Sequence, residues 1–384
     1  MKNIFLSILF LLFVFNAKSS SVWNQKADFG AEGRHRGVGL SIGSRGYIGL
    51  GHYNGTGINI VKSDWWEYDP GTNTWTQKAD FTGNNGFGNY GVVFFEMEDA
   101  GYICGGQQGS GNELIKYTPS TNTWTSVSSP PFSISNVQGF TIDNIGYAIS
   151  SSQLWRYDSF NNLWSSLGPT PFGLSAWNSG FSMNGTGYIK TGNAFWEYKP
   201  TLNLWLQRAN FPGLATGGSV ALVQNGKGYI VGGYGSFLAN VNSEVWEFNP
   251  GTNSWLLLSN FIGTSRRFAA GFNINDVSYM GTGTNGTNFS DFWEFNLIAG
   301  VNDLIYDTEF TTFPNPAITR VNFKSGEYEN GEITIYSMNG DLIRTLNLSN
   351  SKTTLYRDNL TAGVYYYNVM VDDQLIYSNK FIFR

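Results

Sequence analysis

Apolar and aromatic positions recur over most of the chain in short alternating runs, separated by turns rich in Gly, Asn and Asp. Alternation over four to eight residues predicts strands rather than helices. In one well-patterned unit, four strands are expected at residues 90–96, 101–105, 113–117 and 123–127. Six such units begin with a tryptophan that is followed 23 to 27 positions later by a tyrosine, and these pairs are Trp23 and Tyr47, Trp75 and Tyr102, Trp124 and Tyr147, Trp164 and Tyr188, Trp205 and Tyr229, and Trp255 and Tyr279. One four-stranded sheet cannot bury both faces alone, so the repeat predicts sheets stacked around an axis.

The end of the repeat predicts how the ring closes. Five units carry a second aromatic residue seven positions before the next tryptophan, as Tyr68 precedes Trp75, whereas the sixth ends at Phe295 with no tryptophan after it. Trp23 is therefore expected to supply the outermost strand of the last sheet. The fold class predicted is all-β: a six-bladed β-propeller over residues 20–300, followed by a small C-terminal β-sandwich.

Composition agrees with this fold and narrows the partners. Only 13% of the 384 residues are charged, Gly occurs 47 times, and the formal net charge is −5 without any run of Lys or Arg. Nucleic acid and anionic membrane surfaces are therefore poor partners. With Cys104 as the single cysteine and His35 and His52 as the only histidines, we expect no disulfide, no metal site and no cofactor.

The two ends of the chain carry separate signals. Residues 1–19 combine Lys2, an apolar run of 12 positions and small residues at Ala17 and Ser19, which is typical of a signal peptide. No later segment approaches the roughly 20 apolar residues of a membrane helix, so none is expected. Residues 301–312 are predicted to be a linker, and residues 313–384 a second domain with strands at 320–323, 333–336, 342–346 and 364–371.

The repeat resembles the kelch family. The stretch Tyr68-Asp69-Pro70-Gly71-Thr72-Asn73-Thr74-Trp75 has the family's Tyr-Asp step with a tryptophan seven positions beyond the tyrosine, and diglycines are kept at residues 105–106 and 232–233. The other four diglycine positions are altered. The resemblance covers roughly 275 residues and implies a kelch-type propeller without indicating a subfamily.

The tail resembles the type A sorting domain of type IX secretion substrates. The matching segments, in order, are Pro314-Asn315-Pro316, Ile335-Tyr336 with Asn339-Gly340, residues 360–365, and Lys380-Phe381-Ile382-Phe383-Arg384. The resemblance implies export across both membranes to the cell surface or the medium, with the type IX secretion machinery as a partner. A generic adhesive sandwich is the alternative.

Any ligand is expected at the face where the loops from strand four to strand one and from strand two to strand three emerge. The candidate ligand-binding residues there are Arg34, His35, Arg36, His52, Tyr53, Tyr90, Gln107, Trp177, Asn178, Asn193, Tyr234, Arg266 and Arg267. Trp177 or Tyr234 offers a flat face to a sugar ring, and Trp177 is favoured because no other blade shows an aromatic residue at its position. Arg36 and Arg267 suit either a ligand carboxylate or the carbonyls of a neighbouring blade.

The leading functional hypothesis is a non-catalytic propeller that recognises a glycan or a protein. No catalytic residue is assigned, and His35 with His52 as an acid–base pair is the weaker reading of those side chains. The alternative is a kelch-fold enzyme that resembles the sialic acid mutarotases or, with less support, the copper radical oxidases of the galactose oxidase kind. Those oxidases need a cysteine crosslinked to a tyrosine, whereas Cys104 is expected within a blade strand. A structural spacer without a ligand is the third hypothesis.

Overall fold

The computed structural model describes residues 20–108, 112–133, 137–175, 177–298, 310–325, 331–338, 341–348, 352–371 and 374–384. The expected signal peptide at residues 1–19 lies outside the described residues, as do Asn339 and Gly340. The described chain forms two compact units, one spanning Ser21–Leu297 and the other containing the C-terminal strands.

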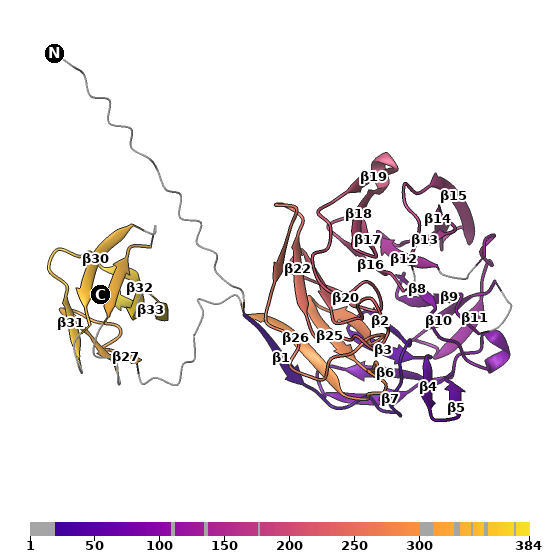
Figure 1. The fold of residues 1–384 in the computed structure, drawn as a ribbon, viewed down its shortest axis with the longest axis horizontal. Coiled ribbons are helices and arrows are strands. Elements are labelled where there is room, and N and C mark those ends of the chain that lie inside the picture. Colours follow the sequence, from indigo (N-terminus) through magenta and orange to yellow (C-terminus); the bar gives the residue numbers. More distant parts are fainter. Residues whose placement is uncertain are drawn as a thin grey trace, which may run out of the picture. The chain divides into compact units, whose positions relative to one another are not determined.

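The first unit consists of six four-stranded antiparallel sheets arranged around a common centre (Figure 1). The inner strands are β2 (Val38–Ile42), β8 (Val93–Met97), β12 (Gln138–Ile142), β16 (Ser179–Met183), β20 (Val220–Gln224) and β24 (Ala270–Ile274). The second strands are β3 (Arg45–Gly49), β9 (Ala100–Cys104), β13 (Ile145–Ser150), β17 (Thr186–Thr191), β21 (Lys227–Val231) and β25 (Val277–Gly281). The third strands are β6 (Trp65–Asp69), β10 (Leu114–Thr118), β14 (Gln153–Asp158), β18 (Ala194–Lys199), β22 (Val245–Asn249) and β26 (Phe292–Ile298). The outer strands are β7 (Thr74–Gln77), β11 (Thr123–Ser126), β15 (Leu163–Pro169), β19 (Leu204–Gln207), β23 (Ser254–Leu257) and β1 (Ser20–Gln25).

The last sheet confirms the predicted closure. Its order is β1-β26-β25-β24, so the first strand of the chain is the outer strand of the sixth blade. Trp23 on β1 is 4% exposed, and its ring centroid lies 4.8 Å from those of both Phe261 and Phe295. The two ends of the repeat are thus joined by strand pairing and by a buried aromatic cluster.

Recurrent Asn and Trp side chains tie four of the six blades to the linker that precedes them, and a Tyr hydroxyl joins the contact in three of these. In blade 1, the Trp75 indole donates to the Ala27 carbonyl at 3.1 Å, while the Oδ1 atom of Asn73 accepts from the Tyr68 hydroxyl and from the Ala27 N–H, both at 2.9 Å. Asn73 has a φ of 55°, a left-handed conformation that Asn tolerates better than most residues. Blade 2 repeats the indole contact at 2.8 Å, between Trp124 and the Ala79 carbonyl. The repeat observed in the sequence is therefore a repeat of inter-blade hydrogen bonds.

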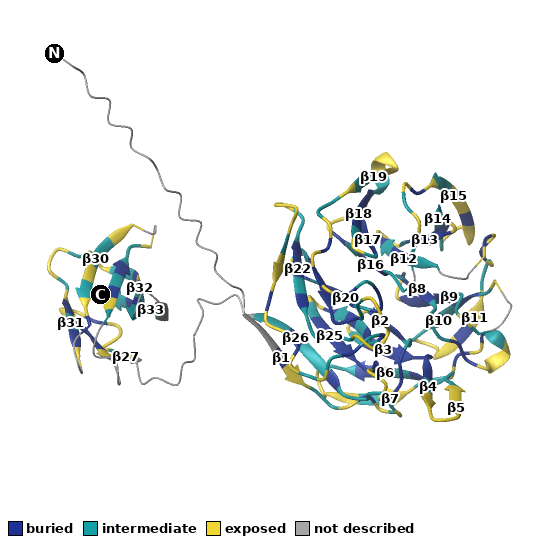
Figure 2. Ribbon diagram, in the orientation of Figure 1, coloured by how far each residue is buried: buried dark blue, intermediate teal, exposed yellow. Residues whose placement is uncertain are grey.

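The glutamates of the third strands also belong to this framework. The hydroxyl of the strand-two tyrosine donates to the strand-three glutamate in four blades, and the pairs are Tyr47 with Glu67, Tyr188 with Glu197, Tyr229 with Glu247 and Tyr279 with Glu294. Figure 2 shows the buried residues concentrated on the inner and second strands of the sheets, and exposed residues on the outer strands. These glutamates therefore stabilise the blades. Residues that do not follow the repeat are found nearer the propeller axis.

The C-terminal unit is a two-sheet sandwich. One sheet contains β27 (Phe310–Phe313), β28 (Arg320–Ser325) and β31 (Thr353–Tyr356), and the other has the order β30 (Leu342–Asn347), β29 (Glu332–Tyr336), β32 (Gly363–Val371) and β33 (Gln374–Phe383). The four strands expected here are present, whereas β27 begins inside the segment expected to be a linker.

The Pro-Asn-Pro motif and the C-terminal strand meet in this unit. The Asn315 side chain accepts from the Ile382 N–H at 3.0 Å and donates to the Lys380 carbonyl at 3.2 Å. The Ala317 N–H donates to the Ile382 carbonyl at 2.7 Å. The first and last motifs of the tail are therefore parts of one folded edge.

Candidate functional site

The loops that enter the inner strands meet around the propeller axis. The residues that matter here stand two positions before the first residue of each inner strand. The described residues at this position are Arg36, Gly91, Trp177, Gly218 and Phe268, and all five have φ between 57° and 67°. Main-chain hydrogen bonds link them from blade to blade. The Gly91 N–H donates to the Arg36 carbonyl, that of Arg36 to Phe268, that of Phe268 to Gly218 and that of Gly218 to Trp177, at distances of 2.8 to 3.0 Å. These bonds fix the backbone around the axis.

Three of these positions carry large side chains in a conformation that favours glycine. Left-handed backbone costs a non-glycine residue roughly 1–2 kcal/mol. Glycine is required at the other two positions, because a Cβ on Gly91 would lie 2.8 Å from the Trp177 ring and a Cβ on Gly218 would lie 2.8 Å from the Phe268 ring. Such outliers persist where the surroundings impose them, and they concentrate at functional sites.

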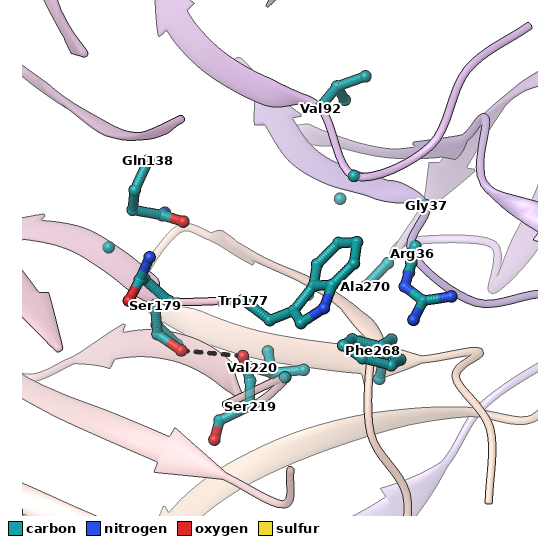
Figure 3. Close-up of a pocket in the computed structure, with 18 of the residues that line it drawn as sticks. Arg36, Gly37, Val92, Gln138, Trp177, Ser179, Ser219, Val220, Phe268 and Ala270 are labelled. Carbon is teal, nitrogen blue, oxygen red and sulfur yellow. Dashed lines mark hydrogen bonds between the residues drawn. The ribbon is translucent and has the colours of Figure 1, made fainter. Parts of the chain in front are cut away.

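Arg36, Trp177 and Phe268 bring blades 1, 4 and 6 together across the axis (Figure 3). The guanidinium carbon of Arg36 lies 4.4 Å from the Trp177 ring centroid and 4.0 Å from that of Phe268. The two rings are 4.9 Å apart at 62°. Blades 1 and 4 are opposite each other in a six-bladed ring, so this contact between a cation and aromatic faces spans the centre.

A cavity of about 420 Å³ adjoins these three side chains and is lined by residues from all six inner strands. Its wall is built largely from small residues such as Gly39, Gly180 and Gly271, whose missing side chains leave the axis open. Arg36 is the one charged residue among the lining residues that the structure describes. The volume lies within the usual range for small-molecule sites.

The two histidines lie side by side and share Arg36. Their main chains pair as a bridge, His35 N–H to His52 carbonyl at 3.1 Å and the reverse at 3.0 Å. Arg36 Nη1 lies 3.1 Å from His35 Nε2 and 3.0 Å from His52 Nε2. The Nδ1 atoms lie 2.8 Å from Asn288 Oδ1 and 2.9 Å from Asn59 Oδ1. Because the guanidinium can only donate, both imidazoles are assigned as Nδ1–H tautomers that accept at Nε2.

Burial and neighbouring positive charge keep this pair neutral. Desolvation, followed by His52, lowers the pKa of His35 to about 3. Desolvation also lowers the pKa of His52, with Arg36 acting in the same direction. The pKa of Arg36 falls to about 10 through burial and then through Arg267, so Arg36 remains a cation at neutral pH. The histidines therefore hold the guanidinium in place as hydrogen-bond acceptors.

Further polar and aromatic side chains surround Arg36. The Tyr90 ring stacks on His52 with centroids 4.1 Å apart at 6°. Tyr234 lies 5.7 Å from Phe268, and burial raises the pKa of its hydroxyl. Arg267 donates from Nη1 to the Leu238 carbonyl at 2.5 Å. The Nε–H groups of Arg36 and Arg267 are both buried and meet no acceptor in the described part of the chain. We call Arg36, Arg267, Trp177, Phe268, Tyr90, Tyr234 and the two histidines the axial cluster.

Most of the thirteen candidate residues lie in or beside this cluster. Gln107 and Asn178 line the cavity. Tyr53 is half-buried on the hairpin formed by β4 (His52–Gly55) and β5 (Ile58–Val61), and Asn193 is exposed. Both lie apart from the cavity lining.

Arg34 and Arg266 belong to the framework, which corrects their inclusion among ligand contacts. Each is at most 2% exposed and forms a two-pronged ion pair with an aspartate of its own blade. Arg34 contacts Asp64 at 2.5 and 2.8 Å, and Arg266 contacts Asp291 at 2.5 and 2.6 Å. Their guanidinium groups are therefore already engaged.

Phe268 corrects the reasoning about Trp177. It occupies the equivalent position in blade 6, so Trp177 is one of two aromatic residues at that place in the repeat. The signal that would have revealed it is the distance to the inner strand, which is the same for Trp177 before β16 and Phe268 before β24.

Comparisons with known proteins agree with this architecture. Residues 311–384 match the family described as the secretion system C-terminal sorting domain, and residues 215–261 match the Kelch motif. The chain is a six-bladed β-propeller that contains a Kelch motif and ends in a secretion system C-terminal sorting domain. Comparison with curated proteins finds no match. The sorting domain indicates type IX export to the cell surface or the medium.

Two solved structures share the fold. The structure of YjhT has 16% sequence identity and a TM-score of 0.59, with 70% of this chain and 95% of that chain covered. A fungal alcohol oxidase of the AA5 family, in complex with copper, has 13% identity and a TM-score of 0.52, with 94% of this chain and 99% of that chain covered. At these identities the likeness concerns the fold alone.

The residues of the kelch propeller do not fit a copper centre. The Nε2 atoms of both histidines point to Arg36, and their Nδ1 atoms point to asparagines. Cys104 is buried within β9, and desolvation raises the pKa of its thiol to about 12. Over the described ranges, no three His, Cys, Asp or Glu side chains are grouped to hold a metal ion.

No helix in the described part of the chain is long and apolar enough to cross a membrane.

Proposed function

We propose that this exported kelch propeller recognises a carbohydrate at the axial cluster and does not transform it. The observation that carries the proposal is Trp177, an indole held in a strained left-handed conformation beside a cavity of about 420 Å³. Aromatic rings at protein surfaces bind the apolar face of a ligand while polar neighbours meet its hydroxyl groups. Gln107, Asn178 and Arg36 are such neighbours.

Two features favour binding over catalysis. An acid–base reaction needs a group that exchanges a proton near neutral pH, but both nitrogens of each histidine are occupied and the pKa of His35 lies near 3. Among the described residues that line the cavity there is neither Asp nor Glu. A carbohydrate is favoured over a protein because the cavity beside the cluster has the volume of a small-molecule site.

A glycan array probed with the full chain and with Trp177→Ala tests this function. We expect the unmodified chain to bind a defined set of glycans, and Trp177→Ala to lose roughly 30-fold in affinity, as is common for a buried tryptophan anchor. Phe160→Ala is the control, because Phe160 is 88% exposed on a turn of blade 3. Trp177→Phe should retain part of the binding.

Two results would contradict the proposal. One is an array without any bound glycan, or one on which Trp177→Ala binds as well as the unmodified chain. The other is a chemical change in the bound sugar. We expect NMR spectra of the glycan incubated with the full chain to show no acceleration of anomer exchange and no product, and either of these would contradict the proposal.

A further inference from the structure

The arginines of the propeller divide into two groups by their counter-charges. Seven arginines lie between residues 21 and 297. Five of them pair with a carboxylate of the propeller, and these pairs are Arg34 with Asp64, Arg45 with Asp69, Arg156 with Asp158, Arg208 with Glu197 and Arg266 with Asp291. Arg36 and Arg267 have no acidic partner among the described residues. In a chain of net charge −5, these two guanidinium groups both lie over the Phe268 ring, with their central carbons 4.0 Å and 5.6 Å from its centroid.

The positive charges of Arg36 and Arg267 repel each other, and both side chains are half-buried. The proximity of Arg267 contributes to the lowered pKa of Arg36, and it also acts against protonation of His35. The groups that face them are neutral: His35, His52, Tyr90 and Tyr234. Two like charges held together without a counter-charge cost free energy in the unliganded protein, and an anion bound between them removes that cost.

Donor capacity is also left over at both side chains. Arg36 uses Nη1 for the two histidines, and Arg267 uses Nη1 for the Leu238 carbonyl. Both side chains are half-buried, so an oxyanion can reach their outer Nη groups and accept charge-assisted hydrogen bonds there.

From these observations we infer that the ligand is an acidic carbohydrate, whose oxyanion group binds between Arg36 and Arg267 while its ring lies against Trp177. This inference rests on the proposed carbohydrate-binding function and names the chemical class of the ligand. Arginine forms paired hydrogen bonds with planar carboxylates and also binds sulfate, so a uronic acid and a sulfate ester share the required chemistry.

The test is calorimetric titration of the full chain with four ligands. They are a trisaccharide of uronic acid, the same trisaccharide after reduction of its carboxyl groups, a sulfated neutral trisaccharide, and inorganic sulfate. We expect one of the two acidic trisaccharides to bind roughly 10- to 100-fold more tightly than the reduced one, the range expected for hydrogen bonds to a charged group. The difference should shrink as salt is added. The two acidic arms distinguish the carboxylate from the sulfate ester.

Three variants locate the effect. Arg267→Gln should abolish the preference for the acidic trisaccharide, and Arg267→Lys should restore part of it. Arg156→Gln removes the same charge from a blade flank, where Arg156 pairs with Asp158, and should leave the preference unchanged. Thermal unfolding of each variant establishes that it is folded, and Arg267 is a suitable site because its side chain is only half-buried.

The outcomes separate this inference from the proposed function. Equal binding of the acidic and reduced trisaccharides, with loss of both in Trp177→Ala, overturns the anionic ligand and leaves carbohydrate recognition in place. Binding of inorganic sulfate as tight as that of any sugar, unaffected by Trp177→Ala, overturns carbohydrate recognition and leaves an anion site. A preference retained in Arg267→Gln also overturns the inference.

Discussion

Arg34 and Arg36 lie two residues apart in one loop and have opposite surroundings. Arg34 is 1% exposed and contacts both carboxylate oxygens of Asp64, whereas Arg36 has a φ of 57° and extends across the axis to an aromatic pair and two neutral histidines. The same contrast recurs in blade 6 between Arg266 and Arg267. The backbone conformation and the placement of a single aspartate decide which arginine stabilises the blade and which remains available to a ligand.

Arg266→Gln is expected to lower the free energy of unfolding by about 3 kcal/mol, because it leaves the Asp291 carboxylate without its partner in a largely buried site. Arg45→Gln breaks an exposed ion pair with Asp69 and should cost less than about 1 kcal/mol. Urea denaturation of both variants measures the difference. Equal losses would mean that the Arg266 pair contributes no more than a surface ion pair.

His35 makes stability depend on pH. Its pKa is about 3 in the folded chain against 6.5 as the ordinary value, so between these limits the unfolded chain binds the extra proton. The free energy of unfolding therefore falls as pH drops from 6.5 towards 3, by up to about 1.4 kcal/mol per pH unit from this group. Glu96, whose pKa burial raises to about 7, acts in the opposite direction between 4.5 and 7.

Comparison with His35→Gln isolates this contribution, since Glu96 is present in both proteins. The variant should lose less stability between pH 6 and pH 4 than the unmodified chain, as measured by urea denaturation at each pH. Parallel curves would show that His35 is not held neutral.

At the scale of the element, strand pairing and loop entry perform separate tasks. The second and third strands carry Tyr–Glu contacts within four of the blades, and the turns and outer strands carry the Asn and Trp contacts that join a blade to the linker before it. The segments that enter the first strands carry most of the axial cluster, and His52 and Tyr234 come from the segments that follow the second strands. A strand order with β1 outside β26 completes the ring without using any residue of that cluster.

Trp23→Ala tests the closing strand. Removing a side chain that is 4% exposed and packed against Phe261 and Phe295 should lower the free energy of unfolding by about 3–5 kcal/mol. Leu163→Ala, on the outer strand β15 and 57% exposed, is the control and should cost little. A loss below about 1 kcal/mol in Trp23→Ala would show that β1 is dispensable for closure.

The strands were predictable from the sequence to within a few residues. This error in the strand starts was large enough to hide which residues occupy equivalent positions in the entry loops. The second inner strand was expected from Tyr90 but begins at Val93, so Tyr90 and Gly91 lie in the entry loop. The equivalence of Trp177 with Phe268 depends on counting back from the strand start, and it stayed hidden. Which arginines meet aspartates depends on contacts about 30 residues apart in sequence, which no spacing rule reveals.

At the scale of the whole molecule, framework and site follow different rules. The framework was predictable because each of its contacts recurs in most blades and leaves a periodic trace: six blades, closure by β1 and the structural glutamates were all confirmed. The axial cluster has no such trace, since the described blades place unlike residues at the same position: Arg36, Gly91, Trp177, Gly218 and Phe268. The central claim is that this cluster is where the exported propeller meets its ligand.

Hydrogen–deuterium exchange of the full chain tests that claim most directly, with and without the glycan that binds most tightly on the array. The account predicts slower exchange in the entry loops around Arg36, Gly91, Trp177, Gly218 and Phe268, with the outer strands unchanged. Protection confined to the outer strands β7, β11, β15, β19 and β23, or to the C-terminal unit, would contradict it.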